Sequence, residues 1–166
     1  MRAVALPLFV ACALVACRDV TKFSSRGGSY EGGVVRGSFV RAGVGEDARL
    51  CMTLDTDHLQ DAPGVVSTTD GRFAKTPLRP IPQIWHDPLS TLAFGDGRVQ
   101  NLLYAATPAN GEGEDAMVVV SLMQSGDLEV RMMRGAPRAD DAGASKPTPL
   151  FAVFTLTRRE DVPCPP

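Results

Sequence analysis

The sequence predicts an all-β protein, built as a single antiparallel β-barrel or sandwich of about eight strands. Three observations indicate this class. Several short runs alternate apolar and polar residues with the two-residue period of a strand. Glycine-containing turn sequences separate neighbouring runs at hairpin spacing. No segment has a convincing helical pattern of apolar residues. Hairpin-connected strands form antiparallel sheets, and closing such a sheet removes its exposed edges, so we favour the barrel.

The first three expected strands occupy residues 30–44, 49–55 and 65–69. Residues 30–44 contain several glycines, which allow bulges or sharp coiling in a long strand. Residues 49–55 alternate well, with three large apolar side chains on one face and shorter or charged ones on the other. The third strand is followed by Asp70 and Gly71, which form a turn signal.

The remaining strands form two hairpins and a final strand. Residues 92–94 and 99–105 flank a Gly-Asp-Gly turn. Residues 116–123 and 128–134 flank a Ser-Gly-Asp turn and make the clearest hairpin in the chain. Residues 150–157 alternate again and form the last expected strand.

Three connections lie between these strands. Residues 56–61 could form a single helical turn at most. Residues 77–88 contain four prolines and the only tryptophan, which predicts a long extended connection. Residues 136–148 are small, charged and proline-containing, which predicts a loop. Neither of the two longer connections separates domains, because strands on both sides are needed to close one core. We therefore expect residues 29–166 to form a single β domain.

The N-terminal residues have the pattern of an export signal. A basic start at Arg2 is followed by an uncharged apolar run over residues 3–16, and polarity returns at Arg18. The run is shorter than the roughly 20 residues that a membrane-spanning helix needs. A charged start, a short apolar region and a small residue before the cleavage point are typical of a secretory signal.

The end of this run, Leu14-Val15-Ala16-Cys17, resembles the lipobox of bacterial lipoproteins. In that family the cysteine is lipidated and the signal is cleaved in front of it. The resemblance implies a signal peptide over residues 1–16, a membrane anchor on Cys17 and a glycine-rich tether over residues 17–28. It also implies sorting to the outer membrane, on its periplasmic face or at the cell surface, because the residue after the cysteine is arginine rather than aspartate. The alternative is an ordinary secretory signal with a chance cysteine.

The chain has four cysteines, and removal of the signal with lipidation of Cys17 would leave Cys51 and Cys164. Disulfides persist in exported compartments, so we expect these two residues to form a bridge within the chain. In the chain-entropy model a loop this long adds up to roughly 4–5 kcal/mol of stability. Two free thiols, or a bridge to another chain, are the alternatives. Neither cysteine lies near the other or near a histidine in sequence, which argues against a metal site.

Few residues suggest catalysis, and we expect no cofactor and no enzymatic activity. His58 and His86 are the only histidines, and no Gly-x-Ser-x-Gly nucleophile motif accompanies them. The aspartates around His58 match only the first positions of a calcium loop, without its glycine or its closing glutamate. The formal net charge is -2, and the charges are spread without a basic block. This pattern argues against nucleic acid as a partner.

Binding is better supported by the sequence. Ile81, Ile84 and Trp85 lie in the proline-rich connection. Proline-stiffened segments lose little entropy when they order on a partner, and tryptophan is enriched in interface hot spots. Alternatively, these side chains plug one end of the barrel. Several methionines also cluster in the second hairpin, where they could fill the core or line an apolar cavity.

Two classes of function remain. The first is a non-catalytic outer-membrane lipoprotein that acts as a binding or scaffold component of a cell-envelope complex, serving motility, secretion or adhesion. Its partners would be other envelope proteins. The second is a carrier or sensor of a small apolar ligand inside the barrel. In outline the expected barrel resembles lipocalin-type lipoproteins, but the Gly-x-Trp motif of that family is replaced by Gly28-Ser29-Tyr30. The resemblance therefore implies architecture alone.

Overall fold

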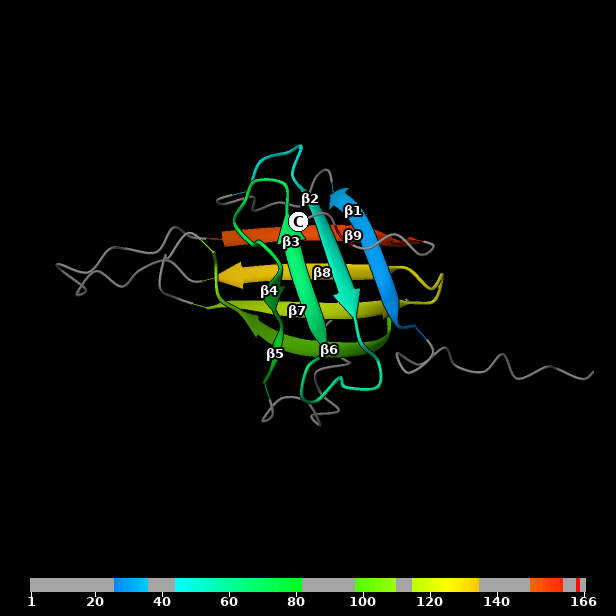
Figure 1. The fold of residues 1–166 in the computed structure, drawn as a ribbon. Coiled ribbons are helices and arrows are strands. Elements are labelled where there is room, and N and C mark those ends of the chain that lie inside the picture. Colours follow the sequence, from blue (N-terminus) through cyan, green and yellow to red (C-terminus); the bar gives the residue numbers. More distant parts are fainter. Residues whose placement is uncertain are drawn as a thin grey trace, which may run out of the picture.

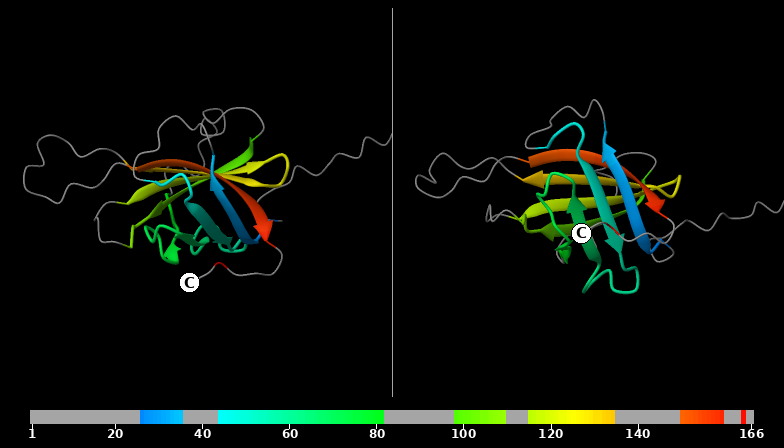
Figure 2. Two further views of the ribbon diagram at one scale, coloured as in Figure 1. Left: turned by 90° about the horizontal axis from the view of Figure 1, so that it is seen from above. Right: turned by 45° about the horizontal axis from the view of Figure 1, so that its top comes forward.

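The computed structural model describes residues 26–35, 44–81, 98–109, 115–134, 150–159 and 164. Within these ranges nine strands form one antiparallel sheet, and there is no helix. The sheet curls into a nearly closed barrel, in which the first four strands cross over the last four (Figures 1 and 2). The predicted all-β class and the antiparallel barrel are confirmed.

Strands that are consecutive in the chain are neighbours in the sheet, with two exceptions. The last strand pairs with the first, and the fourth and fifth strands lie at opposite edges. The strand bounds are β1 (Gly28–Val34), β2 (Arg49–Leu54), β3 (Gly64–Thr68), β4 (Thr76–Pro77), β5 (Arg79–Pro80), β6 (Arg98–Ala106), β7 (Ala116–Met123), β8 (Leu128–Arg134) and β9 (Leu150–Arg159). The order across the sheet is β4-β3-β2-β1-β9-β8-β7-β6-β5. The pairing of β1 with β9 runs from Ser29 opposite Arg159 to Val34 opposite Phe154.

The core fills the inside of the barrel. Along β8 and β9 buried and less buried residues alternate, as the two-residue period of a strand requires. Inward-facing Met52, Val120 and Phe154 have no exposed surface and belong to one apolar cluster. The methionines of the second hairpin divide between the two faces. Met132 lies in the core, whereas the outward positions 117, 123 and 133 are only partly buried.

Two strands of two residues bring the edges of the sheet together, and the sequence did not predict them. Strand β4 pairs with β3, strand β5 pairs with β6, and only Leu78 separates β4 from β5. The Leu78 side chain is 2% exposed, and its N–H donates to the Gly64 carbonyl at 2.9 Å. Pro77 and Pro80 are tolerated here because an edge strand leaves one row of N–H positions unpaired. The proline-rich connection therefore begins as part of the barrel.

Two other expectations lie partly or wholly outside the described residues, and a third, the turn at residues 56–61, agrees with the structure. The first strand runs from Gly28 to Val34, and residues 36–43 of the expected strand lie outside the described residues. Val44 precedes a turn closed by the Ala48 N–H and the Gly45 carbonyl. Residues 56–61 form a turn, in which the His58 carbonyl accepts from the N–H groups of Asp61 and Ala62. The expected strand at residues 92–94 lies outside the described residues.

Candidate functional site

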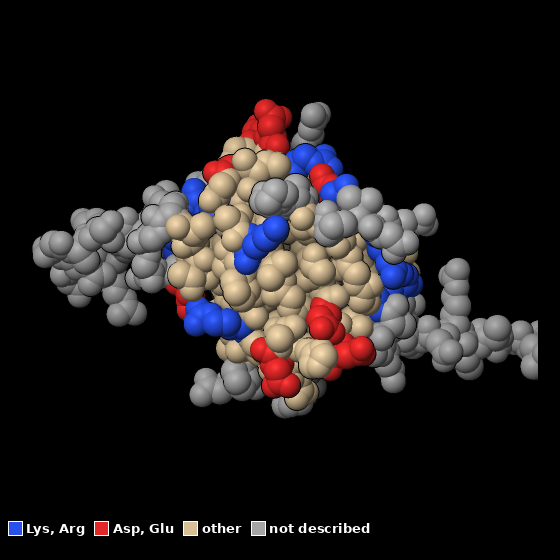
Figure 3. Space-filling model, viewed as in Figure 1, with Lys and Arg blue, Asp and Glu red and all other residues tan. Residues whose placement is uncertain are grey.

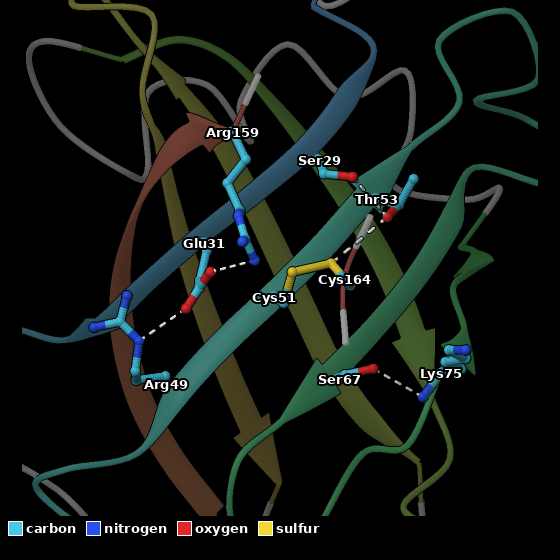
Figure 4. Close-up of a disulfide and its surroundings, with 9 residues drawn as sticks. All are labelled: Ser29, Glu31, Arg49, Cys51, Thr53, Ser67, Lys75, Arg159 and Cys164. Atoms are coloured by element: carbon cyan, nitrogen blue, oxygen red, sulfur yellow. Dashed lines mark hydrogen bonds and ion pairs between the residues drawn. A yellow bond between two sulfur atoms is a disulfide. The ribbon is translucent and has the colours of Figure 1, made fainter. Parts of the chain in front are cut away.

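A disulfide lies on the outer face of β2. Cys51 occupies an outward position of this strand, and it is bonded to Cys164 with the two α-carbons 5.5 Å apart (Figure 4). The predicted pairing of Cys51 and Cys164 is confirmed. Both residues are shielded, with 5% and 8% of their surface exposed. The Thr53 hydroxyl donates to the Cys164 sulfur at 3.6 Å. The bridge thus fixes the C-terminal end of the chain against the second strand.

A cleft of about 370 Å³ opens beside this disulfide. Its walls come from β1, β2, β3 and the turn after β3. It is lined by Glu31, Arg49, Leu50, Cys51, Ser67, Thr68, Thr69, Gly71, Phe73 and Ala74. The face of the molecule that carries these strands is largely uncharged apart from one basic side chain near its middle, and its other charged groups lie toward the margins (Figure 3). The cleft therefore combines an apolar floor with hydroxyl groups and one ion pair.

The turn that forms one wall is braced by side-chain hydrogen bonds. The Thr68 hydroxyl donates to Asp70 at 2.6 Å and accepts from the Phe73 N–H at 3.0 Å. The Lys75 N–H donates to the Ser67 hydroxyl at 3.0 Å. Lys75 has a φ of 46°, a left-handed conformation that a non-glycine residue adopts only at a cost. These contacts hold the wall of the cleft in one geometry.

The opposite wall carries a network of charges on the outer face. Glu31 accepts from Arg49 Nε at 2.9 Å and forms a second ion pair with Arg159 at 2.5 Å (Figure 4). These side chains are 25%, 54% and 29% exposed, so each ion pair adds little stability. None of the described residues that line the cleft is a histidine. Its hydroxyl and charged groups can form hydrogen bonds, and its apolar residues can make contacts with a bound group.

His58 lies apart from this cleft, in the turn between β2 and β3. Its Nδ1 is 2.9 Å from a carboxylate oxygen of Asp55, and both side chains are exposed. The hydrogen bond to Asp55 raises the pKa of His58 above 6.5, and the same contact lowers the pKa of Asp55 below 3.8. Asp57 donates its N–H to Asp55 and closes the turn. The aspartates here therefore shape and solvate a turn.

We expect Asp55→Asn to lower the pKa of His58 toward 6.5, because the charged partner is lost. The pair stabilises the fold only while both groups are charged. That contribution fades as pH rises through the folded pKa of His58 and as it falls through the pKa of Asp55. A proton NMR titration of the imidazole signals measures the shift. His86, the only other histidine, is the internal reference, and an unchanged His58 titration would contradict the assignment.

The structure describes only part of the residues predicted to act in binding or anchoring. Cys17, Ile84, Trp85 and His86 lie outside the described residues. Ile81 is described and partly exposed, and its N–H donates to the Leu103 carbonyl at 3.2 Å. Over the described ranges, no helix is long and apolar enough to cross a membrane. The same ranges contain no group of three or more histidine, cysteine or acidic residues placed to hold a metal ion.

The sequence did not predict the cleft. Its lining combines residues from β1, β2 and the segment 67–74, and these meet only because the sheet brings the strands together and the turn folds back on β3. The Asp-Gly sequence predicted the turn after β3. It did not predict the hydrogen bonds from the Thr68 and Ser67 side chains that stabilise this turn. No local signal marks the left-handed conformation of Lys75. The arrangement could not be read from residue order alone.

Comparisons with known proteins identify no relative: no protein-family model, no curated protein and no solved structure matches this chain.

Proposed function

We propose that this chain is a lipid-anchored, non-catalytic protein of the bacterial outer membrane, acting as a binding or scaffold component of a cell-envelope complex. The lipobox-like sequence ending at Cys17 carries the anchoring half of the proposal. The Cys51–Cys164 disulfide supports it, because such bridges persist in exported, oxidising compartments. Motility, secretion and adhesion machineries are the complexes in which we propose that its partners lie.

The packing of the barrel supports binding at the outer surface rather than transport of a ligand inside. The inward positions carry large side chains, among them Tyr30, Tyr104 and Phe154, which have no exposed surface. Burial raises the pKa of the Tyr104 phenol far above its usual range, because the charged form would lose its contact with solvent there. A carrier would instead need inward positions that leave room for its ligand. We therefore rank the carrier second.

The contact surface we propose includes Ile81 to Trp85. Ile81 continues from β5, and its backbone is held on β6 while its side chain stays partly exposed. A rigid barrel thus fixes the start of the apolar, proline-stiffened segment, which reduces the entropy lost on binding. The cleft beside the disulfide is a second surface with a fixed geometry.

We expect Cys17→Ala to release the protein from membranes into the soluble fraction. Each buried acyl CH₂ contributes about 0.8 kcal/mol, so several chains anchor a protein that would otherwise be soluble. Fractionation of native cells, with mass spectrometry of the N-terminal peptide, measures this result. A crosslinked pull-down from the same membranes tests the second half of the proposal.

Two outcomes would contradict the proposal. Wild-type protein that is already soluble with unmodified Cys17 would exclude the anchor. Recovery of the protein alone, with a lipid or another small molecule inside it, would exclude the scaffold role and favour the carrier. The matched control for fractionation is Cys12→Ala, which removes a cysteine of the same apolar run and leaves Cys17 and the disulfide in place.

A further inference from the structure

The two sulfur atoms of the disulfide have different surroundings. Cys51 lines the cleft beside the bridge, and Cys164 is not among the described residues that line it. Figure 4 shows the Cys51 sulfur on the side of Glu31 and the Cys164 sulfur on the side of Thr53. The cleft volume of about 370 Å³ lies within the roughly 300–1,000 Å³ of small-molecule sites. A small molecule in this cleft therefore meets the bridge at Cys51.

The Cys164 sulfur has a hydrogen-bond donor of its own. The Thr53 hydroxyl donates to it at 3.6 Å and is also 3.3 Å from the Ser29 hydroxyl. Thr53 has a single hydroxyl proton, so Ser29 is the donor in the second contact when Thr53 donates to sulfur. Ser29 and Thr53 are opposite each other in the pairing of β1 with β2. The strand register thus builds a short chain of donors that ends at Cys164.

The charged groups near Cys51 have a net positive charge. Glu31 is opposite Cys51 in the strand register and forms ion pairs with Arg49 and Arg159. One carboxylate beside two guanidinium groups leaves one positive charge uncompensated. The attacking species in thiol–disulfide exchange is a thiolate, and nearby cations favour the thiolate form. This end of the cleft therefore favours a thiolate.

We propose that the cleft admits a low-molecular-weight thiol, which opens the disulfide by attack on Cys51. The incoming thiol loses its proton to water, and its thiolate forms a bond to the Cys51 sulfur. The bond between the two cysteines breaks with its electron pair on Cys164, whose thiolate accepts the Thr53 hydrogen bond and then takes a proton from water. The incoming thiol is oxidised and Cys164 is reduced, so the electrons balance. The products are a mixed disulfide on Cys51 and a free thiol on Cys164.

The reaction would detach the C-terminal end of the chain from β2. The disulfide and the Thr53 hydrogen bond both hold Cys164 at this strand, and exchange breaks the covalent one. A second thiol, or return of the Cys164 thiolate to Cys51, would reverse the modification. The inference goes beyond the proposed function and does not depend on lipidation. It assigns the cleft a class of reactant and the bridge a reversible role.

Mass spectrometry identifies the sulfur that is attacked. The experiment exposes the folded full chain to mercaptoethanol, stops the reaction with acid, alkylates the free thiols and digests the protein. We expect the mercaptoethanol adduct on Cys51 and the alkyl group on Cys164. This arrangement should exceed the reverse one at least about tenfold, because access and leaving group both favour it. The rate of opening should rise in proportion to the thiol concentration.

Thr53→Val tests the donor to Cys164. It should slow the opening at least about threefold, because the leaving thiolate loses its hydrogen bond. Thr53→Ser retains a hydroxyl and should restore the wild-type rate. Thr157→Val is the matched control, since it makes the same change at an exposed threonine whose hydroxyl donates to the Glu31 carbonyl instead of to sulfur. It should leave the rate unchanged.

Three results would each overturn the proposal. An adduct found mainly on Cys164, or equally on both cysteines, would exclude the cleft as the route of attack. An opening rate that stops rising with thiol concentration would mean that the bridge reacts only after the chain unfolds. Equal rates for Thr53→Val and Thr53→Ser would exclude the hydroxyl as the group that stabilises the leaving thiolate. The first two results come from the wild type, so they do not depend on whether a variant folds.

Discussion

Replacing Cys51 and Cys164 together by alanine should lower the free energy of unfolding by about 4 kcal/mol. The two residues are 113 positions apart in sequence. In the chain-entropy model a bond closing a loop this long restricts the unfolded chain by roughly 4–5 kcal/mol. A domain of this size has only about 5–15 kcal/mol of stability in total, so the double variant should be close to its unfolding threshold at physiological temperature. Urea denaturation followed by circular dichroism measures the change.

Alanine is the right replacement because both positions are shielded and a serine hydroxyl there would need a partner. The denaturant slope should rise in the double variant, since an unfolded chain without the bridge exposes more surface. Cys17→Ala serves as the control and should leave the unfolding free energy unchanged. If the free energy of unfolding falls by less than about 1 kcal/mol, the unfolded chain must already keep these two positions close together without the bridge.

The sequence predicted the strands in which buried apolar residues alternate regularly with less buried residues. Every second residue is apolar and buried from Leu128 to Met132 in β8 and from Leu150 to Leu156 in β9, so the two-residue period identifies both the strand and its inner face. The cysteine pair was predictable for a different reason. Exclusion of Cys12 and Cys17 left one pairing, and the structure brings Cys51 and Cys164 within bonding distance.

The rest could not be predicted because it depends on contacts between distant segments. Strands β4 and β5 are two residues each and contain Pro77 and Pro80, which locally argue against a strand. They become strands only because β3 and β6 present edges there. The cleft arises in the same way, from side chains that the register brings together.

Gly32 illustrates how barrel closure constrains a single residue. It sits in β1 between Leu50 of β2 and Leu156 of β9, at the seam that joins the two layers of the barrel (Figure 1). A β-carbon built on Gly32 would lie 1.8 Å from the Thr155 carbonyl oxygen and 3.0 Å from the Leu156 α-carbon. Both atoms belong to backbone, so no side chain can rotate away. The neighbouring Gly33 has nothing within 4 Å of such a carbon.

We therefore expect Gly32→Ala to destabilise the protein by about 3 kcal/mol or more, at or beyond the upper end of the usual cost of overpacking. The added methyl group must push β9 away from β1, and these two strands close the barrel. Gly33→Ala is the matched control, one residue along the same strand, and should change the unfolding free energy by less than about 1 kcal/mol. Urea denaturation of the two variants against wild type measures the difference. Equal effects at both positions would mean that the cost comes from glycine's backbone freedom alone, and the close approach of β9 to β1 at the seam would then be wrong.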